Sequence, residues 1–261
     1  MSTQSIILSV GGLDPTGGAG VLVDVAAARA VGVHGAAVLA VLTVQDGQCF
    51  TDSQTMATGS VRGAIEKVLG GTNVGAVKTG ALGNAEMVEM IAELASRPSF
   101  PPLVVDPVIR STTGGVLLDE DGVQALVNRL LPAAALVTPN LAEARLLTGC
   151  ETSDARGMRL AGRRLVKLGA DAVLVKGGHL KGDELFDVFV DKQGNEDVYR
   201  VERRNFGEVR GTGCALASLA AGLIAGGEDI VSAVRKAREI LLKAMENSRA
   251  IGPGPRVLDF S

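Results

Sequence analysis

Short apolar runs alternate with alanine-rich, helix-like runs along most of the chain, and this alternation restricts the fold more than any other feature. The apolar runs that predict buried strands are residues 5–10, 36–44, 75–79, 103–105, 135–138 and 172–175. The runs that predict helices are residues 21–31, 60–69, 85–96, 120–130, 153–168, 215–225 and 229–249. Because strands that alternate with helices form mostly parallel sheets, we expect an α/β fold with helices on both faces of one sheet.

The chain departs from this alternation at one place. Residues 185–190 and 197–201 flank a turn-like segment at 191–195, which predicts a hairpin. No linker, low-complexity tract or break in composition divides the 261 residues. Since α/β folds of this length are often single domains, we expect one domain over residues 1–261.

Charge and composition argue against several classes of partner. The formal net charge is −3, no basic run occurs and aromatic residues make up 3% of the chain, which argues against nucleic acid. No apolar run is long enough to span a bilayer and no signal peptide is visible, so we expect a cytoplasmic protein without a membrane partner. Cys49, Cys150 and Cys214 are widely spaced, which predicts free thiols rather than disulfides or a zinc site.

The segment Gly-Thr-Gly-Cys precedes the apolar run 215–225. Two glycines around a threonine let backbone N–H groups turn toward one point, and a helix that begins there adds unpaired N–H groups and a partial positive charge. Gly211, Thr212, Gly213 and Cys214 therefore predict an anion site, at whose mouth we expect a lowered pKa for the Cys214 thiol. The four residues alone are equally typical of a tight turn before a buried helix.

A second glycine-rich loop, residues 11–20, follows the first predicted strand. Its glycine density permits the backbone to approach a small ligand closely. A strand, a glycine loop and a helix suggest a dinucleotide fold, but the spacing is not Gly-x-Gly-x-x-Gly and no Rossmann fingerprint is present. The segment 109–115, with arginine, serine, threonines and glycines, looks mobile enough to close over a site.

Polar residues stand where several predicted strands end, which is where α/β proteins place ligand contacts. Gln45 follows one strand, and Lys176, with Gly-Gly-His179 behind it, follows another. An ordinary polar turn and a solvated lysine remain open as alternatives. Asn140 and Glu143 predict a capping box, and they also lie on one face that suits a hydrated magnesium ion carrying phosphates. Taken alone, these two residues favour capping.

Several motifs, taken in order, resemble the hydroxymethylpyrimidine and phosphomethylpyrimidine kinases of thiamin biosynthesis, in the ribokinase superfamily. They are the Gly-Leu-Asp-Pro-Thr-Gly-Gly-Ala-Gly loop, Asp24, Gln45, Asp106-Pro107-Val108, Thr138-Pro139-Asn140 with Glu143, Lys176-Gly-Gly-His179 and Gly-Thr-Gly-Cys214. The resemblance covers nearly the whole chain. It implies a three-layer α/β/α ribokinase-like fold with a central sheet of about eight strands, and a homodimer.

The resemblance also implies roles for residues. It implies a phosphoryl anion hole at Gly211, Thr212 and Gly213, with Cys214 as base toward the substrate hydroxyl. It implies contacts with magnesium and ATP phosphates for Asn140, Glu143, Lys176 and Asp106, and a pyrimidine pocket at Gly12, Asp24, Gln45 and Val108. The implied cofactors are ATP and Mg²⁺, and the implied substrates are 4-amino-5-hydroxymethyl-2-methylpyrimidine and its monophosphate.

The sequence departs from the family pattern at Leu13, Ala81 and Val209-Arg210. The first two enlarge or dry the substrate pocket, so these departures concern the identity of the substrate and not the type of reaction. Arg210 is expected to help hold a phosphate, because a guanidinium suits bidentate contacts with phosphate oxygens. A pyridoxal kinase and a pyrimidine sensor without turnover remain as alternatives.

Overall fold

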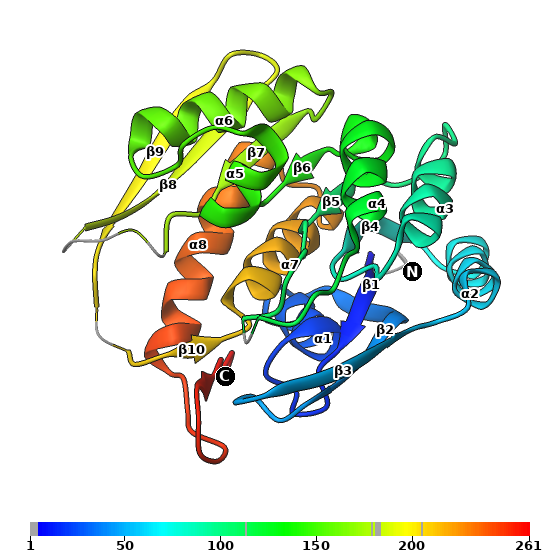
Figure 1. The fold of residues 1–261 in the computed structure, drawn as a ribbon, viewed down its shortest axis with the longest axis horizontal. Helices are drawn as coiled ribbons and strands as arrows, with labels where there is room; N and C mark the ends of the chain where they lie inside the picture. The colour runs from blue at the N-terminus through cyan, green and yellow to red at the C-terminus, as the bar shows by residue number, and fades with distance from the viewer. Residues whose placement is uncertain (1–4, 113, 179, 181–183, 205) are drawn as a thin grey trace.

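The computed structural model of the protein describes residues 5–112, 114–178, 180, 184–204 and 206–261 (Figure 1). His179 of the lysine motif and Thr113 of the segment 109–115 lie outside the described residues. The elements are β1 (Ile6–Leu13), α1 (Gly20–Ala30), β2 (His34–Gln45), β3 (Phe50–Thr55), α2 (Thr58–Gly71), β4 (Val74–Thr79), α3 (Ala85–Ala95), β5 (Leu103–Val105), α4 (Glu120–Ala125), the π-helix η1 (Leu126–Leu130), the 3-10 helix η2 (Leu131–Ala133), β6 (Leu136–Val137), α5 (Leu141–Thr148), α6 (Ala155–Lys167), β7 (Ala172–Val175), β8 (Glu184–Asp191), β9 (Glu196–Glu202), β10 (Val209–Arg210), α7 (Thr212–Ala225), α8 (Ile230–Glu246) and β11 (Arg256–Val257).

The described strands β1 to β9 form one sheet in the order β3-β2-β1-β4-β5-β6-β7-β8-β9. The six strands from β2 to β7 in this order pair in parallel. β3 pairs antiparallel at one edge, and β8 with β9 forms the expected antiparallel hairpin at the other. The α/β expectation is therefore confirmed, with nine strands in the sheet rather than about eight.

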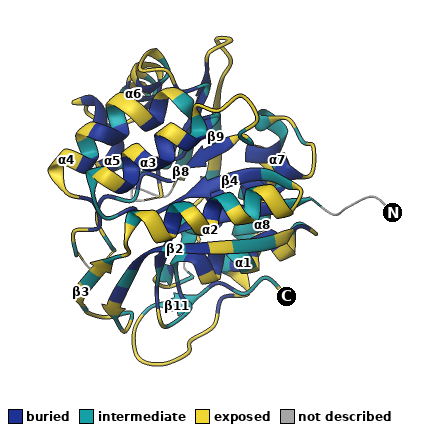
Figure 2. Ribbon diagram, turned by 90° about the vertical axis from the view of Figure 1, so that its right-hand side faces the viewer, coloured by how far each residue is buried: buried dark blue, intermediate teal, exposed yellow. Residues whose placement is uncertain are grey.

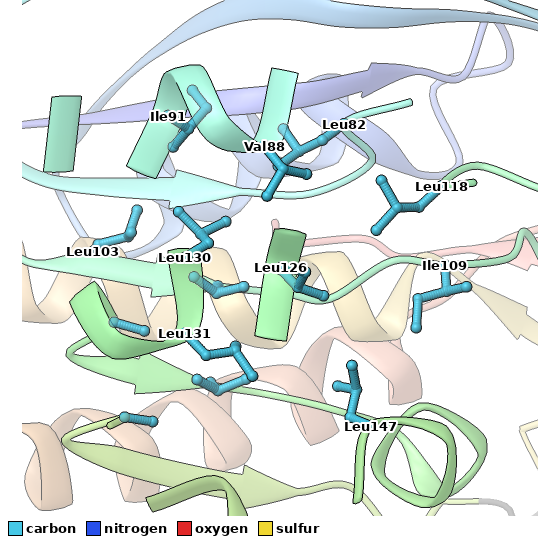
Figure 3. Packing of buried hydrophobic residues seen from close by; sticks show 14 of the residues in the cluster. Leu82, Val88, Ile91, Leu103, Ile109, Leu118, Leu126, Leu130, Leu131 and Leu147 are labelled. Carbon is cyan, nitrogen blue, oxygen red and sulfur yellow. The ribbon is translucent and has the colours of Figure 1, made fainter. Parts of the chain in front are cut away.

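Helices cover both faces of the sheet, as Figures 1 and 2 show. One apolar cluster joins the sheet to α2, α3, η1, α5 and α6. In it, Val88 and Ile91 of α3 lie beside Leu126 and Leu130 of η1 (Figure 3). A second cluster joins the other face to α1, α7 and α8. This arrangement is the three-layer α/β/α architecture.

The order of the strands reverses beside β1. The chain runs from β1 to β2 on one side and later returns to β4 on the other side of β1. In open parallel sheets, ligands bind at such a switch point, outside the carboxyl ends of the strands. The fold therefore places a ligand site where β1, β2 and β4 end.

Helix α7 begins at Thr212, directly after Gly211, as the glycine motif predicts. Gly211 has φ 76°, and a Cβ on it would lie 2.2 Å from the carbonyl oxygen of Gly18. Only glycine fits a left-handed position with so close a neighbour. The two glycine-rich loops thus pack against each other, and together they set the start of α7.

The three cysteines are free: Cys49 is exposed, Cys150 is buried and Cys214 is half-buried. This agrees with the prediction of free thiols. Within the described part of the chain, no helix combines the length and the apolar character that crossing a bilayer requires.

Candidate active site

A cavity of about 180 Å³ lies at the carboxyl ends of β1, β2, β4 and β5, at the switch point of the sheet. Its walls contain every residue that the sequence predicted for a site: Gly12, Asp24, Gln45, Asp106, Val108, Asn140, Glu143, Lys176, Arg210, Gly211, Thr212, Gly213 and Cys214. These residues come from segments far apart in the chain. The fold therefore brings the predicted positions together around one space, whatever role each one has.

Lys176 lies beside the first turn of α7. Its Nζ is 2.8 Å from Oδ1 of Asp106, and a Cβ built on Gly213 would lie 3.2 Å from the same Nζ. Burial alone would lower the pKa of Lys176, but the carboxylates of Asp106 and Glu143 raise it above its usual value. A cationic ammonium and a helix N-terminus thus face the same part of the cavity, which favours an anion between them.

Asp106 is buried at the end of β5 and stays charged. Burial opposes its ionisation, but Lys176 and then Lys78 hold the pKa of the carboxyl below its usual range. The Thr138 hydroxyl also donates to Oδ1 at 3.4 Å. Asp106 therefore fixes Lys176 in place at the anion-attracting end of the cavity.

Asn140 and Glu143 form the capping box that the sequence predicts at the start of α5. The Glu143 N–H donates to Oδ1 of Asn140 at 2.9 Å, and the Asn140 N–H donates to Oε2 of Glu143 at 2.7 Å. Burial raises the pKa of Glu143 to about 7; Lys176 opposes the shift and Asp106 adds to it. The capping interpretation is confirmed, and the carboxyl group also faces the cavity.

The described residues contain no group of three or more His, Cys, Asp or Glu side chains that could hold a metal ion. Mg²⁺ often keeps several waters and takes one or two carboxylates together with the phosphates of its substrate. One carboxyl group, Glu143, with the Asn140 amide beside it fits such a hydrated ion. It does not fit a cation held by protein ligands alone.

Cys214, the third residue of α7, has a different ionisation from the one expected. Burial raises the pKa of its thiol to about 11; Lys78 lowers it, whereas Asp106 and Asp24 raise it further. The expected lowering is therefore wrong, because loss of hydration and two nearby carboxylates outweigh Lys78 and the backbone N–H of Gly20. In the free protein the thiol is protonated at neutral pH.

Lys78 lines the cavity and was missed in the sequence analysis. It is fully buried on β4, and its Nζ lies 3.0 and 2.9 Å from the two carboxylate oxygens of Asp24. The hydroxyls of Ser9 and Ser218 donate to the same carboxylate at 2.5 and 2.8 Å. Burial would lower the pKa of Lys78, but Asp24 keeps it raised. A charged residue inside an apolar run was the signal that could have marked it.

Arg210 and Gln45 meet at the other end of the cavity. Nη2 of Arg210 donates to Oε1 of Gln45 at 2.5 Å and lies 3.3 Å from Oδ2 of Asp14. The expected phosphate contact of Arg210 stays a prediction. Nearby, Ala81 packs close to β1, since a Cβ on Gly12 would lie 3.3 Å from the Ala81 Cβ.

Comparisons with known proteins agree with this arrangement. The sequence profile of the phosphomethylpyrimidine kinase family matches residues 14–259. This chain belongs to that family. A hydroxymethylpyrimidine/phosphomethylpyrimidine kinase from Rhizobium meliloti is 39% identical over 246 residues, which are 92% of this chain and 90% of the relative.

Two solved structures of related kinases have the same fold as this member of the phosphomethylpyrimidine kinase family. A pyridoxal kinase from Bacillus subtilis, solved as an ADP complex, superposes with a TM-score of 0.90 at 26% identity, over 99% of this chain and 98% of that one. A phosphomethylpyrimidine kinase from Clostridium difficile gives 0.80 at 30% identity, over 92% and 99%. The ribokinase-like fold expected from the resemblance is confirmed.

Proposed function

We propose that this kinase transfers the γ-phosphoryl group of ATP to the hydroxyl of 4-amino-5-hydroxymethyl-2-methylpyrimidine, to the phosphate of its monophosphate, or to both, in thiamin biosynthesis. The observation that carries the proposal is the Lys176 ammonium beside the N-terminus of α7, inside the cavity that holds every predicted site residue. Phosphoryl transfer depends on positioning and on stabilising charge that spreads over phosphate oxygens. A cation and converging backbone N–H groups meet both needs.

Each end of the cavity has its own task in this proposal. The N–H groups of Gly211 to Cys214 hold the transferred phosphoryl group, and Lys176, fixed by Asp106, neutralises its charge. Glu143 and Asn140 would hold a hydrated Mg²⁺, which supplies positive charge to the ATP phosphates when bound. Gly12, Gln45 and Val108 would place the pyrimidine ring so that the acceptor oxygen points toward α7.

Pyridoxal kinase is the second candidate, because the pyridoxal kinase from Bacillus subtilis superposes with the higher TM-score of the two structures compared. Pyridoxal also carries a hydroxymethyl group on a ring. The deciding experiment measures ATP consumption with the hydroxymethylpyrimidine, its monophosphate and pyridoxal side by side. Turnover with a pyrimidine supports the proposal, and turnover with pyridoxal alone contradicts it. Tight pyrimidine binding without turnover would identify a sensor.

We propose further that the chain is a single cytoplasmic domain and acts as a homodimer. The domain proposal rests on the unbroken alternation of elements, and the dimer rests on the family resemblance. Analytical ultracentrifugation tests the dimer, since a single species at the mass of one chain would contradict it.

A further inference from the structure

The contact between Arg210 and Gln45 joins two residues that are 165 positions apart in the chain. Arg210 is 6% exposed, and its Nη2 lies 2.5 Å from Oε1 of Gln45. Gln45 is half-buried and lines the cavity at the end of β2. The contact therefore lies in the wall of the proposed substrate pocket and joins β2 of the main sheet to Arg210 of β10.

A guanidinium group has N–H donors and no acceptor, so an amide that faces it must present its oxygen. This fixes which way round the Gln45 carboxamide stands. Its Nε2 has no hydrogen-bond partner among the residues that the structure describes. Because Gln45 is half-buried and lines the cavity, this N–H₂ group is available to donate to a hydrogen-bond acceptor of a ligand there.

Arg210 also forms an ion pair with a buried carboxylate. Its Nη2 lies 3.3 Å from Oδ2 of Asp14, which is 2% exposed. Oδ1 of Asp14 accepts from the Thr16 N–H at 3.0 Å and from the Thr16 hydroxyl at 2.9 Å. A chain of polar contacts thus runs from the first glycine-rich loop through Asp14 and Arg210 to Gln45.

We propose that Arg210 is a positioning residue that orients the Gln45 amide, so that this pocket selects substrates with a hydrogen-bond acceptor, such as a ring nitrogen lone pair, opposite Gln45 Nε2. This inference rests on the proposed function. A carboxamide can donate and accept at the same time. One lone pair of Oε1 is already taken by Arg210. This positioning role differs from the expectation that Arg210 binds a phosphate directly.

The direct phosphate role makes a different prediction. Nε and Nη1 of Arg210 are buried without a hydrogen-bond partner in the described structure. Nη1 faces the backbone at Gly47, where an added Cβ would lie 3.2 Å away. If these groups instead bind the phosphate of the monophosphate, removal of Arg210 should raise the KM for the monophosphate far more than the KM for the free alcohol. If Arg210 only positions Gln45, its removal should raise the KM for both substrates to a similar extent, because both present the same ring to Gln45.

The test is a double-mutant cycle with Arg210→Met, Gln45→Ala and the double variant, assayed with both pyrimidines. We expect Arg210→Met to raise the pyrimidine KM about tenfold, equivalent to about 1.4 kcal/mol, with kcat and the KM for ATP nearly unchanged. In the Gln45→Ala background the same change should raise KM less than twofold, since Arg210 then has no amide to orient. Arg200→Met, which removes an exposed arginine of β9, is the matched control.

Additive losses in the cycle, or an unchanged KM in Arg210→Met, would overturn the positioning role.

Gln45→Glu gives a second test that does not remove Arg210. A glutamate still accepts from Arg210 but has no N–H to offer, so we expect KM to rise at least as much as in Gln45→Ala. A normal KM in Gln45→Glu would refute the inference. Arg210→Lys, which keeps one donor near Oε1, should restore part of the affinity. A wild-type enzyme that phosphorylates neither pyrimidine would instead contradict the proposed function.

Discussion

Cys214 illustrates how the surroundings of one residue change a prediction. A thiol at a helix N-terminus is expected to ionise easily, yet burial raises the pKa of this thiol to about 11. At pH 7 a thiol with that pKa is a thiolate in roughly one molecule in 10⁴. A role as base toward the substrate hydroxyl therefore depends strongly on pH, which gives a way to test it.

We expect Cys214→Ala to lower kcat for the free alcohol by roughly 10²-fold or more, the lower end of the range for a general base. The ratio of wild-type to variant kcat/KM for the free alcohol should rise about tenfold per pH unit between pH 7 and 9, because kcat/KM reports ionisation of the free enzyme, in which the thiolate fraction rises with pH. With the monophosphate, whose acceptor oxygen is already anionic, Cys214→Ala should lower kcat much less. Steady-state kinetics of both substrates at several pH values provide the measurement.

Cys214→Asp is the informative companion variant. A carboxyl group ionises at a much lower pH than a thiol in the same surroundings, so it should restore part of the activity toward the free alcohol and reduce the steep pH dependence. Full activity of Cys214→Ala toward the free alcohol would show that the thiol only packs, and that the backbone N–H groups alone serve the reaction.

Gln45 carries the second prediction for a single residue. Gln45→Ala should raise the pyrimidine KM by about 1–3 kcal/mol in equivalent free energy, because polar atoms of the ligand lose their partner. The KM for ATP should stay nearly unchanged, since Gln45 lies at the opposite end of the cavity from Lys176. Unchanged kinetics with the pyrimidine would make Gln45 an ordinary polar residue at the end of a strand.

The first turn of helix α5 contains Glu143, a residue that serves both the fold and the proposed site. Glu143 caps the helix and faces the cavity, and burial raises its pKa to about 7. Because an acid gains charge above its pKa, we expect kcat/KM for ATP to rise as the pH passes upward through about 7. This parameter reports ionisation of the free enzyme.

Glu143→Gln is the matched variant for α5. Glutamine at this position also completes a capping box, so the helix should remain folded. We expect a lower kcat/KM and loss of the rise near pH 7, while the titration of ATP itself is the same for both proteins. If the variant keeps the wild-type pH profile, Glu143 is not the group that titrates.

The sequence predicts most elements well because their signals are local. Short apolar runs between helix-like runs predicted the parallel strands, and the spacing of Asn140 and Glu143 predicted the start of α5. β3 was missed, because Phe50–Thr55 is mostly polar and lies at the exposed edge of the sheet. The predicted helix 120–130 is divided into α4 and the π-helix η1, a change that periodicity does not reveal.

The site was predictable as a set of positions, but not as a set of interactions. Motifs at strand ends identified Gln45, Asn140 and Lys176, since the fold brings the carboxyl ends of parallel strands together. The family resemblance was needed for Gly12, Asp24, Asp106 and Val108. The Arg210–Gln45 contact and the ionisation of Cys214 depend on side chains that approach from distant segments. No local pattern in the sequence reports such distances.

At the scale of the whole molecule, Lys78 and Asp24 tie the layers together. Lys78 belongs to β4 in the sheet and Asp24 to α1, while Ser218 of α7 donates to the same carboxylate. Both charged side chains are 1% exposed. A buried charge without its partner is costly, whereas replacing both partners by apolar residues is often neutral.

We therefore expect Lys78→Met to lower the free energy of unfolding by about 3–5 kcal/mol, because it leaves Asp24 buried and unpaired. Urea unfolding followed by circular dichroism measures the change. The double variant Lys78→Met, Asp24→Leu should recover much of the stability. A double variant less stable than Lys78→Met would contradict this account of the pair.

The same double variant also separates two roles for Asp24. The resemblance implies that Asp24 lies beside the pyrimidine, but in the structure its carboxylate oxygens are occupied by Lys78 and two serine hydroxyls. If the pair only supports the fold, the double variant should regain activity together with stability. If Asp24 or Lys78 acts on the reactants, stability should return while kcat stays low, and Lys78, beside Cys214, would be the first residue to examine.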